Sequence, residues 1–274
     1  MGRQKQFKHR VVIAGNHETT ADGPEYYAKN HRRFHASSRQ DDAAVRKLLR
    51  ECPHFTYLEH GSVTVGGVKI FGSPWTPVFC DWAFNYDRYN GRPAELWRES
   101  ESGREVYVFD WIDGTDRARP SHARTHVRTH ARTHGRTHGR TDAHTHTHAR
   151  TNGRAVPADA DVVATHGPPI GYGDTCEPRA RMDRAGCVEL LRRLREVRPQ
   201  VHVFGHIHES YGVWTDELGI KYINASTCNY HYKPLNDPVV VDVVAGGAQA
   251  SGNGNAAITG DTRVDFDFGS DLNV

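Results

Sequence analysis

The hydrophobic residues of this chain fall in short runs that are bounded by glycine, proline or polar residues. Runs of this length that are rich in valine and isoleucine predict β-strands. The predicted strands are 10–14, 55–58, 62–65, 69–71, 160–164, 201–204, 220–223 and 239–244. Gly61 separates the second run from the third, and the Gly66-Gly67 pair separates the third from the fourth. Glycines between short strand-like runs favour tight turns, which predicts adjacent antiparallel strands.

Two segments, 41–50 and 187–197, instead have apolar residues at helical spacing. Asp41 can cap the first helix, and Pro199 ends the second. The apolar residues predicted to share a face are Val45, Leu48 and Leu49 in the first helix and Val188, Leu191, Leu194 and Val197 in the second. Strands that alternate with loops and helices predict an α/β sandwich.

The composition narrows the class of protein further. The 274 residues are 37% hydrophobic, and no apolar run approaches the roughly 20 residues of a membrane-spanning helix. The basic amino terminus is not followed by the apolar region of a signal peptide, so we expect a cytoplasmic protein. The five cysteines are widely spaced and include no C-x-x-C pair, which predicts reduced thiols.

Residues 117–154 form a repeat of Arg, Thr and His that differs from the rest of the chain. The stretch holds nine arginines and one acid, whereas the whole chain has a net charge of +2, so the remainder is mildly acidic. Its only apolar residue larger than alanine is Val127, so we expect disorder. Nucleic-acid binding and weak metal binding are open alternatives, but a translated tetranucleotide repeat explains the period of four without either, and we assign no site here.

Three predicted strands end in loops that carry histidine. The loops are Gly15-Asn16-His17-Glu18, Thr165-His166-Gly167-Pro168 and Gly205-His206-Ile207-His208. Strand ends of an α/β fold meet at one crevice, so we expect these side chains to lie together. Imidazoles and an amide oxygen can bind Mn, Fe or Zn ions, and a pair of such ions is a common device for phosphoryl hydrolysis. His17 is then free to stabilise charge on the phosphate or to protonate the leaving oxygen.

Several motifs together resemble one known superfamily. G-N-H-E (15–18), T-H-G-P-P (165–169) and G-H-I-H (205–208) are similar to the motifs of calcineurin-like metallophosphoesterases. F-G-S-P-W-T-P (71–77), G-C-V-E-L-L (186–191), R-P-Q-V-H-V-F-G-H-I-H-E (198–209) and Y-I-N-A-S-T-C (222–228) resemble the metallophosphoesterase-domain-containing (MPPED) subgroup. The resemblance covers about residues 10–244, apart from the repeat.

The resemblance implies a four-layer αββα sandwich that hydrolyses phosphomonoesters or phosphodiesters with two divalent ions. Asn16, His166 and His206 would bind one ion and His208 the other, while His17 would be the catalytic histidine. In the subgroup, cyclic nucleotides are the expected substrates. We therefore expect a small-molecule phosphoester as the partner, and neither a membrane nor a nucleic acid.

The chain departs from the superfamily pattern in one respect. The Asp-x-His and Gly-Asp motifs that supply further ligands are absent, and residues 1–15 contain no Asp or Glu. The sandwich would then lack its first strands, either because the sequence starts late or because the chain is a truncated descendant that binds metal or nucleotide without turnover. We expect a phosphoesterase domain over 1–244, interrupted by a low-complexity insertion at 114–155, and a flexible tail at 245–274.

Overall fold

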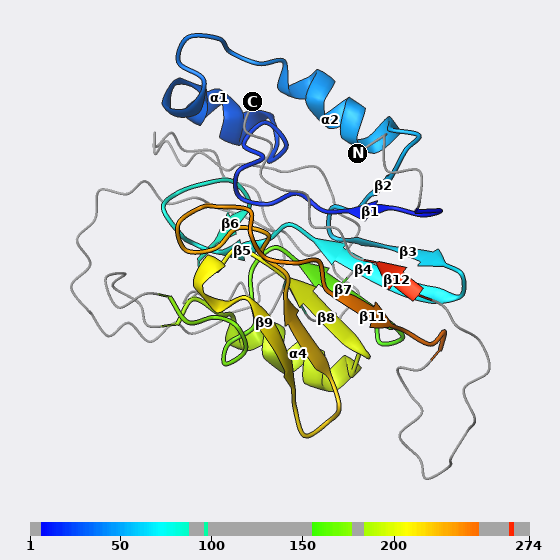
Figure 1. Cartoon of the computed structure of the whole chain (residues 1–274). Helices are drawn as coiled ribbons and strands as arrows, with labels where there is room; N and C mark the ends of the chain where they lie inside the picture. Colours follow the sequence, from blue (N-terminus) through cyan, green and yellow to red (C-terminus); the bar gives the residue numbers. More distant parts are fainter. Residues whose placement is uncertain (1–6, 88–95, 98–154, 177–183, 247–262, 266–274) are drawn as a thin grey trace, which may run out of the picture.

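The computed structural model describes residues 7–87, 96–97, 155–176, 184–246 and 263–265, and a six-stranded sheet lies at its centre (Figure 1). The order across the sheet is β3-β4-β7-β8-β10-β9. The strands are β3 (Gly61–Val65), β4 (Val68–Ser73), β7 (Val162–Thr165), β8 (Val201–Phe204), β9 (Gly212–Thr215) and β10 (Lys221–Asn224). The four inner strands are parallel and the edge strands β3 and β9 are antiparallel, so the inner strands all end at the same edge.

The two sides of this sheet face two separate hydrophobic clusters. Side chains of successive strand residues point to opposite faces, so the pairs Ile70/Phe71 and Val162/Val163 divide between the clusters. Phe71 and Val163 pack with Leu190 and Leu194 of a helix, whereas Ile70 and Val162 pack with Leu58, Val243 and the half-buried Val11. The sheet is therefore buried on both sides, as expected for parallel strands.

The predicted hairpin is present, but one of its predicted neighbours pairs elsewhere. Gly66 and Gly67 take φ angles of 57° and 85° in the turn between β3 and β4. The expectation that 55–58 pairs antiparallel with 62–65 is wrong, because β2 (Thr56–Tyr57) runs parallel to β1 (Val11–Val12) in a separate two-stranded sheet. His60, buried and with a φ of 54°, turns the chain between the two sheets, and its Nδ1 lies 3.1 Å from Ser73 Oγ.

Both predicted helices are present, and the first has the cap that the sequence predicts. Helix α2 (Asp42–Glu51) begins after Asp41, whose carboxylate accepts a hydrogen bond from Ala44 N at 3.0 Å. Helix α4 (Val188–Val197) begins after Cys187, whose Sγ accepts from Leu190 N at 3.3 Å.

Two residues predicted to face the core of these helices are instead exposed. Leu48 is 66% exposed and Val188 is 48% exposed. Leu190, rather than Val188, fills the inward position in the first turn of α4. No residue of helix α2 is fully buried, so its apolar face is only partly covered by the rest of the protein. The prediction that Val188 points inward is thus wrong, and Leu48 is more exposed than Val45 and Leu49, with which it was predicted to share a face.

Helix α1 (Pro24–Phe34) was not predicted, because its sequence is largely polar and charged. It is fixed by the buried tyrosines Tyr26 and Tyr27, and Figure 1 shows it beside α2 at the end of the molecule that carries β1 and β2. Helix α4 packs on one face of the sheet, because Leu190 and Leu194 share a hydrophobic cluster with Phe204 and Tyr222. The α/β class is thus confirmed, while the four-layer order stays a prediction.

The remaining elements are β5 (Thr76–Pro77) with β6 (Asn85–Tyr86), the short 3-10 helix η1 (His208–Ser210), and β11 (Val240–Asp242) with β12 (Arg263–Asp265). The Arg/Thr/His repeat lies outside the described residues, as does most of the predicted tail apart from β12. All five cysteines are free thiols, as predicted. No helix in the described part of the chain has the length and apolar character that a membrane crossing needs.

Candidate functional site

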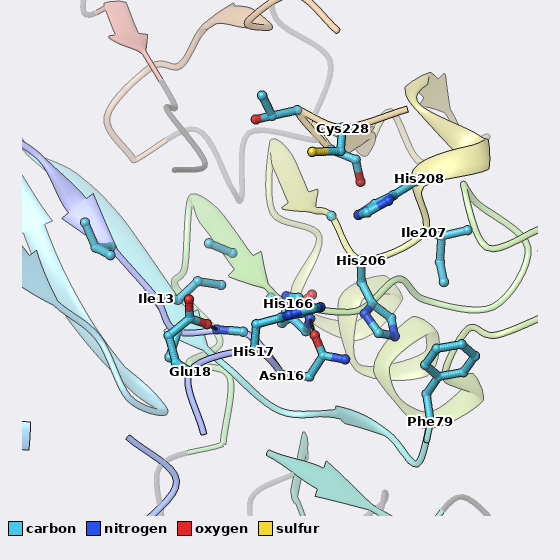
Figure 2. Close-up of a pocket in the computed structure, with 18 of the residues that line it drawn as sticks. Ile13, Asn16, His17, Glu18, Phe79, His166, His206, Ile207, His208 and Cys228 are labelled. Atoms are coloured by element: carbon cyan, nitrogen blue, oxygen red, sulfur yellow. Dashed lines mark hydrogen bonds between the residues drawn. The ribbon is translucent and has the colours of Figure 1, made fainter. Parts of the chain in front are cut away.

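The three histidine-bearing loops predicted from the sequence line one pocket of about 260 Å³. The first loop follows β1, the second follows β7, and the third follows β8. The five predicted site residues lie on its wall, namely Asn16, His17, His166, His206 and His208 (Figure 2). Because β7 and β8 are adjacent and parallel, their carboxyl ends bring two of the loops together.

Asn16 and His166 make the closest polar contact of this group. His166 Nε2–H donates to Asn16 Oδ1 at 2.9 Å, although the two residues are 150 positions apart in sequence. Gly15 permits the approach, since a Cβ at that position would lie 2.6 Å from Cε1 of the His166 ring. Glu18 stabilises this loop by accepting a hydrogen bond from Gly15 N.

His206 lies next to His166, with 4.7 Å between the ring centroids. Its backbone has a φ of 70°, a left-handed conformation that is uncommon for a residue with a side chain. Gly205 N donates to His166 O at 3.0 Å, so the second and third loops are tied together beside the two rings. Phe79 meets the His206 ring edge-on at 5.5 Å (Figure 2).

The environment keeps both of these imidazoles neutral. Burial, together with repulsion from the neighbouring His208 and His17, lowers the pKa of His206 to about 4. Burial likewise holds the pKa of His166 well below its ordinary value, with added repulsion from His206, His17 and His208. Neutral imidazoles can act as metal ligands, so the pocket presents them in the form that a cation requires.

His208 and His17 stand apart from this central pair. The His208 ring lies on the opposite side of His206 from Asn16, near Cys228, and meets the exposed Tyr232 ring at 5.1 Å (Figure 2). His17 is exposed, and its ring lies 4.3 Å from that of Trp82. The pocket therefore has a partly buried centre formed by His166 and His206, flanked by the half-buried His208 and the exposed His17.

The donor types at the centre fit one divalent ion. Asn16 Oδ1 and the nitrogens of His166 and His206 are suitable ligands for a borderline metal. Nevertheless, no group of three His, Cys, Asp or Glu side chains in the described chain is arranged so that it could hold a metal ion. The two acidic residues of the pocket wall are Glu18, which is turned back onto Gly15 N, and the exposed Glu209. The described residues thus bring three candidate metal donors together at the pocket wall.

Comparison with known proteins identifies relatives for most of the chain. Metallophosphoesterase domain-containing protein 1 from Homo sapiens and that from Mus musculus are each 32% identical over 245 residues, which is 86% of this chain. A UPF0046 protein from Caenorhabditis elegans is 29% identical over 259 residues, or 89% of this chain and 48% of the relative. No protein-family model matches.

The chain is a homologue of the metallophosphoesterase domain-containing proteins. This confirms the resemblance that the motifs predicted. The chain spans 56% of the length of the human and mouse metallophosphoesterase domain-containing proteins that it matches.

The structure also gives a positioning role to Asn224, which the sequence placed in the Y-I-N-A-S-T-C motif without assigning it a function. Asn224, at the end of β10, is fully buried, and its amide donates to Ile207 O at 2.8 Å and to Gly173 O at 3.2 Å. Its Oδ1 accepts from Ser226 N at 3.1 Å. Asn224 therefore holds the loop that contains His206 and His208. Its position after an apolar run, like that of His166, is the signal that could have indicated it.

Proposed function

We propose that this chain is a metal-dependent phosphoesterase whose substrates are small phosphate esters, with phosphodiesters such as cyclic nucleotides as the favoured class. The observation that carries the proposal is the convergence of Asn16, His166 and His206 on one pocket, with the accessible His17 beside them. The names of the human and mouse relatives, which describe a metallophosphoesterase domain, support the same class.

Asn16, His166 and His206 are the residues that would hold a divalent ion, and His208 would contribute to a second. Such an ion lowers the pKa of a bound water and neutralises phosphate charge, which is the chemistry that ester hydrolysis needs. The low pKa values of His166 and His206 support this role, since neither ring must lose a proton near neutral pH before it binds.

His17 differs from these residues because it is exposed at the pocket wall. An imidazole at this position is within reach of a phosphate ester that enters the pocket. In the protonated form it would donate a hydrogen bond to a phosphate oxygen and pass its proton to the leaving oxygen, which is general-acid catalysis. We assign His17 the catalytic role on this basis.

Aromatic side chains on the pocket wall support an ester that carries a planar ring. Phe79 and Tyr230 are 41% and 40% exposed, and Tyr232 is 73% exposed. Exposed aromatic rings beside a polar centre offer stacking surface at small entropic cost. The nucleobase of a cyclic nucleotide would stack on these aromatic faces, which favours cyclic nucleotides over small alkyl phosphates as substrates.

The test is hydrolysis of 2′,3′- and 3′,5′-cyclic nucleotides by the purified chain with added Mn²⁺ or Zn²⁺, together with calorimetric titration of each metal. We expect metal-dependent turnover that His17→Ala reduces by roughly 100-fold or more while metal affinity is retained. The matched control is His231→Ala, which removes an exposed histidine outside the pocket wall. Metal or nucleotide binding without turnover would instead favour the alternative, a fold that has kept the ligands but lost the reaction.

A further inference from the structure

A short segment between β5 and β6, residues 79–84, places two aromatic rings against two of the pocket histidines. Phe79 meets the His206 ring at 5.5 Å, and Trp82 meets the His17 ring at 4.3 Å with an angle of 51° between the planes. Phe79 lies on the pocket wall, whereas Trp82 is not among the wall residues.

The backbone of the 79–84 segment is held in an unfavourable conformation. Cys80, Asp81 and Phe84 have φ angles of 56°, 53° and 53°, all in the left-handed region. Non-glycine residues rarely adopt that region, and those that do persist where surrounding contacts enforce the conformation. Three of them within five residues indicate that the shape of this segment is imposed by its neighbours.

Hydrogen bonds from two directions impose this shape. Arg33, in α1, donates to Cys80 O at 2.8 Å and to Asp81 O at 3.2 Å. On the other side, Ala83 N donates to Asn16 O at 3.1 Å. The segment is thus attached both to α1 and to the loop that carries His17.

Trp82 is held between two rings by this arrangement. Phe34, the last residue of α1, packs on Trp82 at 5.1 Å, and His17 lies 4.3 Å from it. His17 is exposed, and no hydrogen bond to a described residue fixes its imidazole. The contact with Trp82 is therefore what restricts the rotation of a side chain that would otherwise sample several rotamers.

We propose that Trp82 is a positioning residue, which fixes the imidazole of His17 toward the pocket. Its position is set by the strained 79–84 segment and by Phe34. The kinetic consequence rests on the proposed function, because only a catalytic His17 links its orientation to turnover. The structural consequence, an ordered His17 ring, does not depend on that function.

The first experiment measures the His17 ring directly by NMR, with the Cε1–H signal assigned through His17→Ala. A ring 4.3 Å from an indole experiences a ring-current shift, so we expect a displaced signal in the wild-type chain. Trp82→Leu should return the signal to the position of a free histidine, and Trp82→Phe should keep part of the displacement. An unchanged signal in Trp82→Leu overturns the proposal.

The second experiment measures hydrolysis of p-nitrophenyl phosphate and bis-p-nitrophenyl phosphate with Mn²⁺. For Trp82→Leu we expect kcat to fall about 10- to 100-fold with KM nearly unchanged, because a misplaced catalytic group slows the reaction without weakening binding. Trp82→Phe should restore most of the loss. A rise in KM alone, or equal losses in both variants, would contradict a positioning role.

Trp214→Leu is the matched control, since Trp214 is a half-buried tryptophan on β9 away from the pocket wall. Thermal unfolding of all variants separates loss of folding from loss of position. If the wild-type chain hydrolyses neither ester, the proposed function fails, while the NMR signal of His17 still decides whether Trp82 packs on the His17 ring.

Discussion

Substitution of Gly15 by alanine tests whether the close approach of the first and second loops forms the site. The added Cβ would lie 2.6 Å from Cε1 and 2.7 Å from Nδ1 of the His166 ring. Ordinary carbon contacts begin near 3.5 Å, so the ring must withdraw by about 0.9 Å. The hydrogen bond from His166 Nε2 to Asn16 Oδ1 is 2.9 Å long and would exceed hydrogen-bonding distance after such a shift.

The expected effects follow from this displacement. Gly→Ala at a permissive position stabilises a protein by about 0.4 to 1 kcal/mol, whereas forced overpacking costs about 1 to 3 kcal/mol. We therefore expect Gly15→Ala to lower the free energy of unfolding by about 1 to 2 kcal/mol. Because two candidate metal ligands separate, metal affinity should fall by roughly 10- to 100-fold.

The assay combines urea unfolding with calorimetric titration of Mn²⁺ or Zn²⁺. Gly205→Ala is the control, because Gly205 precedes His206 as Gly15 precedes Asn16, yet its added Cβ would meet only Ser226 Oγ, at an ordinary 3.5 Å. The reasoning is refuted if Gly15→Ala binds metal as tightly as Gly205→Ala and is equally stable.

Three further predictions concern stability and the repeat. Asp22 is buried, and desolvation raises its pKa from 3.8 to about 8, so the native state keeps a proton that the unfolded chain releases. The stabilisation from protonated Asp22 is complete below about pH 4 and is lost as the pH rises through about 8, and the free energy of unfolding falls by up to about 1.4 kcal/mol per pH unit. Urea unfolding at several pH values should show a flatter dependence for Asp22→Asn. If the free energy of unfolding of Asp22→Asn falls equally steeply with pH, the dependence does not come from Asp22. Asp41→Ala removes the cap of α2 and should cost about 1 kcal/mol by thermal unfolding, with no change if the cap does not form in solution. Removal of residues 117–154 should leave ester hydrolysis unchanged, and loss of activity would assign the repeat a function after all.

Helices, strands and turns can be predicted from the sequence where interactions between residues close in the chain determine them. The Gly66-Gly67 turn, the Asp41 cap and the apolar runs of β7 and β8 are set by backbone freedom, capping and burial within a few residues. Helix α1 escaped prediction because two tyrosines in a polar segment become a buried contact only when the rest of the chain surrounds them. The partner of β2 escaped for a similar reason, since pairing with β1 joins residues 45 positions apart.

Some features of the candidate site can likewise be predicted from the sequence, whereas others depend on the tertiary structure. Its residue types and their positions after strands are visible in the sequence, because loops at strand ends carry polar side chains in a recognisable order. The contacts that give the site its chemistry join distant segments: Asn16 with His166, His206 with Phe79, and His17 with Trp82. The sequence alone thus determined which side chains are available and which family the chain resembles. Only the tertiary structure decided which rings are half-buried and neutral and which one stays exposed. Burial and ring contacts depend on segments that are far apart in the chain and pack together only in the fold.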